Sequence, residues 1–163
     1  MKQSQHISSK VMSREALLQQ AQRWRLLGRR VVFTNGCFDI LHRGHLHSLN
    51  EAAGFGDVLV VGANADASVQ KLKGPHRPIN NQNDRALMLA SLLVTDAVVI
   101  FEEDTPQALI EALQPDVLVK GGDYTVEQIA GAADVLRRGG EVKIVPLVAG
   151  YSTTGLIQKI HSL

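Results

Sequence analysis

The sequence predicts one α/β domain with a doubly wound (Rossmann-like) sheet of five parallel strands and helices on both faces. Two observations predict it. Apolar, β-branched runs recur along the chain, and each is separated from the next by a segment of helical pattern. Because these runs are apolar at every position, both faces of the sheet need covering helices, and right-handed crossovers supply them. The expected strands are 31–34, 58–61, 97–101, 117–119 and 142–146.

Boundary residues justify the helices in order. The residue types at their ends are those preferred at helix N-caps, at first turns and at helix stops. The expected helices are one from Ser13 to Leu27 ended by Gly28, one over 82–92 capped by Asn81 and Asp84, one over 106–113 started by Thr105-Pro106 and stopped by Pro115, one after the capping-box pair Thr125 and Gln128 that ends at Gly139-Gly140, and one from Ser152 to about His161.

Composition limits the protein to one ordinary globular domain. The chain has 163 residues, 45% of them hydrophobic, and a formal charge of +1. We expect residues 1–12 to form a flexible segment and residues 13–163 to form the domain. Lys and Arg are scattered, so neither a nucleic acid nor a membrane is expected as a partner. No run approaches the roughly 20 apolar residues of a membrane helix, and the start lacks a signal-peptide pattern, which predicts a cytoplasmic protein.

The segment 31–45 is the most informative part of the chain. A strand ends in a polar loop, and the histidines His42 and His45 bracket Gly44 where a helix begins. A helix start offers unpaired N–H groups and positive potential to an anion, and each imidazole can donate a further hydrogen bond. Gly36 and Gly44 lack a Cβ where a ligand would come close. This arrangement predicts a cradle for nucleotide phosphates.

Other interpretations of this loop stay open. The histidines His42, His45 and His47 could be ordinary loop and helix residues, or metal ligands at H-x-x-H spacing. Zinc normally needs four ligands, often thiolates, and Cys37 is the sole cysteine of the chain. That cysteine can form no internal disulfide and could be a small, buried filler at the strand end.

Further polar residues follow the other expected strands, where ligands of such sheets bind. Four cations, Lys71, Lys73, Arg77 and Arg85, lie in the expected loop between the second strand and the helix at 82. They could neutralise a triphosphate, or be a solvated loop. The other residues have similar alternatives: Asn64 and Asp66 could meet a base or ribose or be a helix cap, Lys120-Gly121-Gly122-Asp123 could open the backbone to a ligand or make a turn, and Ser152, Thr153 and Thr154 could bind phosphate or cap a helix.

Several runs resemble a known family. Thr34-Asn35-Gly36-Cys37-Phe38-Asp39, His42-Arg43-Gly44-His45 and Ser152-Thr153-Thr154 are similar to the motifs of cytidylyltransferase-like nucleotidyltransferases. The runs Leu72-Lys73-Gly74, Arg77-Pro78, Phe101-Glu102-Glu103-Asp104-Thr105-Pro106, Pro115-Asp116 and Val119-Lys120-Gly121-Gly122-Asp123-Tyr124 are similar to those of heptose 1-phosphate adenylyltransferases, which make ADP-heptose. The resemblance covers about 13–161.

The resemblance implies a stand-alone adenylyltransferase supplied by a separate kinase and working in the synthesis of lipopolysaccharide core precursors. It implies ATP as co-substrate with Mg²⁺, D-glycero-β-D-manno-heptose 1-phosphate as acceptor, no protein-bound metal, and a homodimer. The roles expected are catalysis for His42, His45 and Lys73, nucleotide binding for Thr34, Asn35, Gly36, Cys37, Phe38, Gly44, Asn64, Asp66, Lys120, Gly121, Ser152, Thr153 and Thr154, and sugar-phosphate binding for Asp39, Arg77, Arg85, Gly122 and Asp123.

Two rival functions stay open at this point. One is a cytidylyltransferase that acts on another sugar or alcohol phosphate with CTP. The other is a regulatory module that binds nucleotide without turnover.

Overall fold

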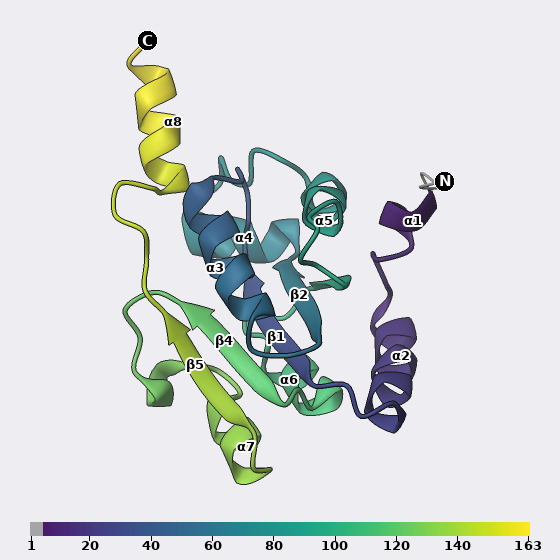
Figure 1. Cartoon of the computed structure of the whole chain (residues 1–163). Coiled ribbons are helices and arrows are strands. Elements are labelled where there is room, and N and C mark those ends of the chain that lie inside the picture. Colours follow the sequence, from purple (N-terminus) through teal and green to yellow (C-terminus); the bar gives the residue numbers. More distant parts are fainter. Residues whose placement is uncertain (1–4) are drawn as a thin grey trace.

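Five parallel strands form one sheet in the computed structural model, which describes residues 5–163 (Figure 1). The strand order is β3-β2-β1-β4-β5, so β1 lies at the centre and the order reverses between β1 and β4. The strands are β1 Val31–Gly36, β2 Val58–Asn64, β3 Ala97–Phe101, β4 Val117–Gly121 and β5 Glu141–Val145. This confirms the predicted fold class, and it places the expected ligand-binding crevice beside the carboxyl end of β1.

Helices cover both faces of the sheet. One face carries α2 (Arg14–Leu26), α6 (Gln107–Leu113) and α7 (Ala132–Arg137), and the other carries α3 (Arg43–Ala53) and α5 (Gln82–Ala90). The remaining elements are α1 (Gln5–Ser8), α4 (Asp66–Lys73), the 3₁₀ turn η1 (Val126–Gln128) and α8 (Thr153–His161). Among residues 5–163 no helix is long and apolar enough to cross a membrane.

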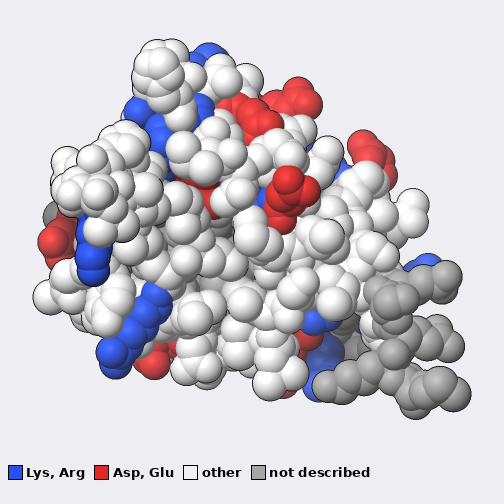
Figure 2. Space-filling model, turned by 90° about the horizontal axis from the view of Figure 1, so that it is seen from above, with Lys and Arg blue, Asp and Glu red and all other residues white. Residues whose placement is uncertain are grey.

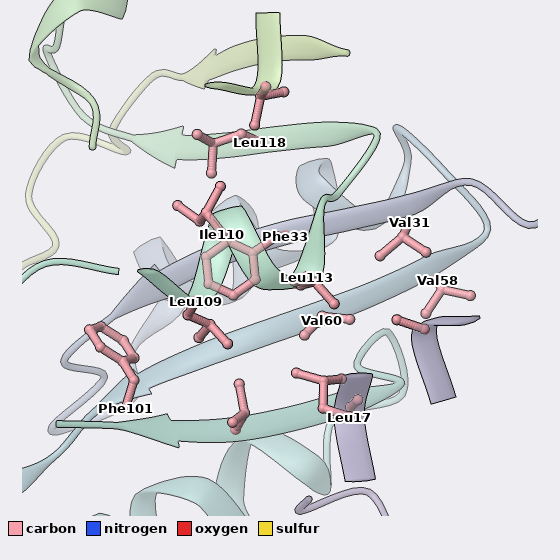
Figure 3. Close-up of a cluster of buried hydrophobic side chains, with 14 of the residues drawn as sticks. Leu17, Val31, Phe33, Val58, Val60, Phe101, Leu109, Ile110, Leu113 and Leu118 are labelled. Carbon is pink, nitrogen blue, oxygen red and sulfur yellow. The ribbon is translucent and has the colours of Figure 1, made fainter. Parts of the chain in front are cut away.

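The core consists of two apolar layers separated by the sheet. On the α6 side, Phe33 of β1 lies among Leu109, Ile110 and Leu113, and Figure 3 shows its ring in the middle of this cluster. Phe33 is completely buried, so truncating it to alanine would cost about 3–5 kcal/mol of stability. Packing against α6 therefore fixes the central strand β1 on one face, and the end of this strand positions the site.

Helix ends follow the predicted caps closely. The Ser13 side chain accepts a hydrogen bond from the N–H of Ala16, and the Asn81 side chain accepts from the N–H groups of Asn83 and Asp84. Gln128 completes the predicted capping box by accepting a hydrogen bond from the N–H of Thr125 at 2.9 Å. Local sequence therefore sets these boundaries.

Two element predictions are wrong. The segment expected as a loop after β2 begins with the helix α4, which carries Lys71 and Lys73. The helix expected between Thr125 and Gly139 is split into η1 and α7, because Gly131 takes a left-handed φ of +82°. A Cβ at Gly131 would lie 2.8 Å from Ile110, so packing against α6 forces the break.

Residues 5–12 also contain more structure than the sequence pattern indicated. Gln5–Ser8 forms α1, Val11 makes an isolated parallel bridge with Val98, and the N–H of Met12 donates to the carbonyl of Val98 at 2.9 Å. These contacts attach the end of the expected flexible segment to the edge strand β3. Residues 1–4 lie outside the described part of the chain.

Candidate active site

A cavity of about 590 Å³ opens at the carboxyl ends of β1, β2 and β4. The starts of α3 and α8 complete its wall, together with Lys73 from the end of α4. Residues far apart in sequence therefore converge, as predicted. The sequence-predicted residues in the wall are Thr34, Asn35, Gly36, Cys37, Phe38, Asp39, His42, Gly44, His45, Asn64, Lys73, Arg77, Lys120, Gly121, Ser152, Thr153 and Thr154.

The two histidines of the loop form a stacked pair. Their ring centroids lie 3.8 Å apart with an interplanar angle of 18°. His42 is the N-cap of α3, and its Nδ1 accepts a hydrogen bond from the backbone N–H of His45 at 3.4 Å. Because that nitrogen accepts, the proton of neutral His42 sits on Nε2, which is then free to donate.

Both imidazoles favour the neutral form. Burial lowers the pKa of His45 to about 4, and the neighbouring His42 adds to this effect. Burial also lowers the pKa of His42. Two neutral rings can stack without repulsion and can each donate one hydrogen bond to an anion, which fits the predicted role as donors rather than nucleophiles.

Positive charge surrounds the floor of the cavity near Cys37. Burial raises the pKa of this thiol, while the cations Lys73, Arg85, Arg77 and Lys120 act in the opposite direction. Cys37 is thus within electrostatic reach of four positive side chains from α4, α5, β4 and the loop after α4. On the face seen from above, Figure 2 shows several Lys and Arg residues close to Asp and Glu.

Two of those cations have no carboxylate partner among residues 5–163. Lys73 makes no ion pair in this part of the chain, and Lys120 contacts the ring of Tyr124 with its Nζ 5.5 Å from the centroid. Burial lowers the pKa of Lys120, because a desolvated ammonium is costly without a counter-ion. An anionic ligand would relieve this cost. Lys71 differs, because it pairs with Asp104 on the surface at 2.8 Å.

Arg77 is already neutralised by Asp39. The Nε of Arg77 donates to Oδ2 of Asp39 at 2.5 Å, and the N–H groups of Ile79 and Asn80 donate to its Oδ1. Burial alone would raise the pKa of Asp39, but these hydrogen bonds and the guanidinium hold it below its ordinary value. Both residues line the cavity, and the carboxylate of Asp39, predicted to bind the sugar phosphate, already accepts three hydrogen bonds from protein groups.

Arg85, a predicted substrate-binding residue, lies away from the cavity. Its side chain is completely buried and outside the cavity wall. It donates to the carbonyls of Cys37, Asn64 and Asn80 and to the carboxylate of Asp66, at 2.6 to 3.0 Å. The sequence showed a cation in a polar region, but the packing of α5 against the sheet turned it inward.

Three more predicted ligand residues also lie outside the wall. Asp66 pairs with Arg85 and is in the first turn of α4, where Ala65, not Asp66, is the N-cap. Gly122 has a φ of +127° and its N–H donates to the carbonyl of Val145, which makes it a turn residue, and Asp123 is exposed beside it. The plain-turn alternative therefore holds for Gly122.

The glycines of the first loop make room for protein side chains. A Cβ at Gly36 would lie 3.0 Å from the ring of Phe38, and one at Gly44 would lie 3.1 Å from the ring of His42. The space left by each missing Cβ, which was predicted to admit a ligand, is thus occupied by an aromatic ring of the cavity wall.

The hydroxyl row meets the cavity at the start of α8. Ser152 caps this helix by accepting from the N–H of Gly155 at 3.0 Å, and Thr153 donates weakly to the carbonyl of Ile40 at 3.4 Å. Thr154 makes no hydrogen bond to another described residue through its side chain. The capping interpretation therefore applies to Ser152, and the hydroxyl of Thr154 is left for the predicted phosphate contact.

Sequence reasoning missed several wall residues, among them Ser48, Tyr124 and Tyr151. Ser48 lies one helical turn after Gly44, so it shares the cavity side of α3. Tyr124 directly follows the polar run that begins at Lys120, Tyr151 directly precedes Ser152, and both tyrosines stay partly exposed. Half-exposed aromatics beside a predicted phosphate loop were the available signal.

Metal chemistry finds no support in the donor set. Among residues 5–163 no three His, Cys, Asp or Glu side chains gather closely enough to hold an ion. The H-x-x-H alternative therefore lacks the further ligands that zinc requires.

Comparisons with known proteins agree with this site. The family model described as Cytidylyltransferase-like matches residues 33–158. The Bifunctional protein HldE of Koribacter versatilis is 56% identical over 94% of this chain and 32% of its own length, and that of Mesorhizobium japonicum is 59% identical over 85% and 28%. The chain spans about a third of the length of these curated relatives.

Solved structures give the same result. The lipopolysaccharide core biosynthesis protein from Thermoplasma volcanium superposes with a TM-score of 0.60 at 31% identity, covering 74% of this chain and 98% of that one. The pantoate-beta-alanine ligase from Francisella tularensis, at 13% identity and a TM-score of 0.59 over 94% and 78% of the two chains, shares the fold. A sheet-end cavity with stacked histidines, a family model across most of the chain and relatives above half identity lead to one conclusion: this chain belongs to the cytidylyltransferase-like family of nucleotidyltransferases.

Proposed function

We propose that this chain transfers AMP from ATP to D-glycero-β-D-manno-heptose 1-phosphate and releases pyrophosphate, giving ADP-heptose for the lipopolysaccharide core. The observation that carries the transfer chemistry is the convergence of the stacked histidines, the unpaired cations and the hydroxyl row on one cavity. The sugar is supported by the sequence resemblance and by the relative described as a lipopolysaccharide core biosynthesis protein.

The cavity suits a triphosphate beside a sugar phosphate. Together these ligands carry several negative charges, and Lys73 and Lys120 are cations of the wall without carboxylate partners. The N–H groups at the starts of α3 and α8 add positive potential from two directions. We assign Lys73 to the departing pyrophosphate, and Ser152, Thr153 and Thr154 to the β- and γ-phosphates.

The acceptor needs no general base. The second pKa of a phosphate monoester is near 6, so its oxygen is already ionised at neutral pH. That oxygen attacks the α-phosphorus of ATP, the new P–O bond forms as the bond to the pyrophosphate oxygen breaks, and the electron pair leaves with pyrophosphate. The protein's task is to align the two phosphates and to stabilise charge in the transition state.

The histidines stabilise that charge. His42 donates from Nε2, and His45 meets the α-phosphate at the start of α3, with both rings held by their stacking and by the cap hydrogen bond. Burial favours the neutral form of both rings in the free protein. Each ring then has one N–H to donate and no second ring proton to lose before the reaction.

Magnesium gains no free carboxylate from the cavity wall. Asp39 accepts hydrogen bonds from Arg77, Ile79 and Asn80, and Asp104 pairs with Lys71. The donor set therefore does not fit a protein-bound Mg²⁺, and we propose that the ion arrives as the complex with ATP.

The experiment supplies ATP or CTP with each anomer of the heptose phosphate and Mg²⁺. We expect ADP-heptose by mass spectrometry and equimolar pyrophosphate with ATP and the β-anomer, and formation about 10²- to 10³-fold slower with the His45→Ala variant as matched control. A product formed only from CTP or only from another phosphate would contradict the substrate. ATP binding without pyrophosphate from any acceptor would identify a regulatory module instead.

A further inference from the structure

Arg85 is a buried cation that touches no part of the cavity. Its side chain is 0% exposed, although its neighbours Cys37 and Asn64 both line the wall. Burying a guanidinium costs several kcal/mol unless its N–H groups are satisfied, and an apolar side chain of similar size would avoid the cost. We therefore expect the several hydrogen-bond donors of the guanidinium to be required at this position.

The guanidinium ties three separate segments together. It donates to the carbonyls of Cys37 after β1 (2.6 Å), Asn64 at the end of β2 (2.7 Å) and Asn80 before α5 (3.0 Å), and to Asp66 (2.8 Å). Asn80 in turn bonds Asp39. Only the planar fork of arginine offers enough fixed donors for four acceptors around one point.

The bond to Cys37 fixes the next residue. Phe38 has a left-handed φ of +48°, which is rare for a side chain of this size and persists only where the surroundings enforce it. In a trans peptide the C=O and N–H point in opposite directions. Since the carbonyl of Cys37 points inward to Arg85, the N–H of Phe38 points outward to the cavity, and no described residue accepts a hydrogen bond from it.

We propose that Arg85 is a positioning residue for the transfer, which holds the Cys37–Phe38 peptide so that the N–H of Phe38 faces the nucleotide phosphates. This inference rests on the proposed function for the identity of the reaction. Its structural part concerns any phosphate chain that enters the cavity.

The test compares Arg85→Lys with wild type in the full chain. Lysine keeps the charge but has only three donors, all on one nitrogen, so it cannot reach the four acceptors of Arg85 at once, and misplacement by about 1 Å costs about 10²-fold in rate. We expect kcat to fall about 10²-fold while the Kd of ATP, measured by calorimetry, changes less than about threefold, since Arg85 itself does not touch the ligand and only one backbone N–H is displaced. Arg137→Lys, an exposed arginine paired with Asp134, is the matched control and should match wild type.

Chemical rescue adds a measurement that a general loss of stability would not move. Guanidinium at about 10 mM, which is far below denaturing concentration, should raise the kcat of Arg85→Ala at least about tenfold. Urea at the same concentration should not raise it. If Arg85→Ala does not fold, the Arg85→Lys result decides alone. The proposal is overturned if folded Arg85→Lys keeps kcat within threefold of wild type, or if its ATP affinity falls as much as kcat, which would make Arg85 a direct phosphate ligand.

A second readout separates this proposal from the choice of substrate. Pyrophosphate should shift the amide NMR signal of Phe38 in wild type and in Arg137→Lys, and much less in Arg85→Lys. Equal shifts in all three proteins would reject the role of Arg85, even if the acceptor sugar proves to be a different one. A reduced shift in Arg85→Lys would support it, even if the wild type makes no ADP-heptose.

Discussion

The two helix starts that face the cavity have the same local chemistry and very different support. α3 and α8 each begin at a capping side chain, His42 or Ser152, that accepts from the backbone three residues later. Leu49 and Ala52 fix α3 to the sheet, whereas no residue of α8 is buried and the helix projects away from the domain (Figure 1). The start of α3 is therefore held by packing, whereas we expect the start of α8 to gain order when a ligand binds.

The start of α3 should carry the chemistry. His45→Ala removes a donor held at a rigid helix start, and the loss of one transition-state donor costs about 10²- to 10³-fold in kcat. Pyrophosphate release at saturating ATP measures it. His47→Ala, at a partly buried position of α3 outside the cavity wall, serves as control and should change kcat less than about twofold. A loss below threefold for His45→Ala would remove the contrast between the two helices.

The start of α8 should act on binding. The double variant Thr153→Val and Thr154→Val removes two hydroxyls, each about 1.5–3 kcal/mol against a charged phosphate at most, so we expect KM for ATP to rise at least about tenfold. The melting temperature should barely move, because α8 buries no residue. Ser162→Ala, whose hydroxyl bonds Lys159 at the far end of α8, is the control. An unchanged KM would show that ATP does not reach this helix.

The smallest effect concerns the pH dependence of stability. His45 has a pKa of about 4 in the folded protein, below the ordinary 6.5 of the unfolded chain. Between these values the unfolded chain binds a proton that the folded protein does not, so the free energy of unfolding falls as pH drops from 6.5 to 4 and then levels off. In His45→Gln this contribution disappears. Urea midpoints at pH 7, 5.5 and 4.5 should therefore decline less in the variant, and equal declines would contradict a buried neutral His45.

Elements could be predicted because their signals are local. The five strands, their parallel order along the chain and the caps at Ser13, Asn81 and Ser152 all follow from residues within one turn of each other. The prediction of one helix after Thr125 was wrong because the break at Gly131 depends on its packing against Ile110, which is remote in sequence. The homodimer and the cytoplasmic location stay predictions.

The sequence by itself determined that a set of polar loops gathers at one edge of the sheet, because parallel strands with right-handed crossovers bring all their carboxyl ends there. Only the tertiary structure decided which cations are free to meet a ligand. Arg77 and Arg85 pair with the carboxylates of Asp39 and Asp66, 38 and 19 residues away, while Lys73 and Lys120 have no carboxylate partner among residues 5–163. A charge is neutralised by the groups that tertiary packing places within a few ångströms of it. The residue type alone does not determine those distances.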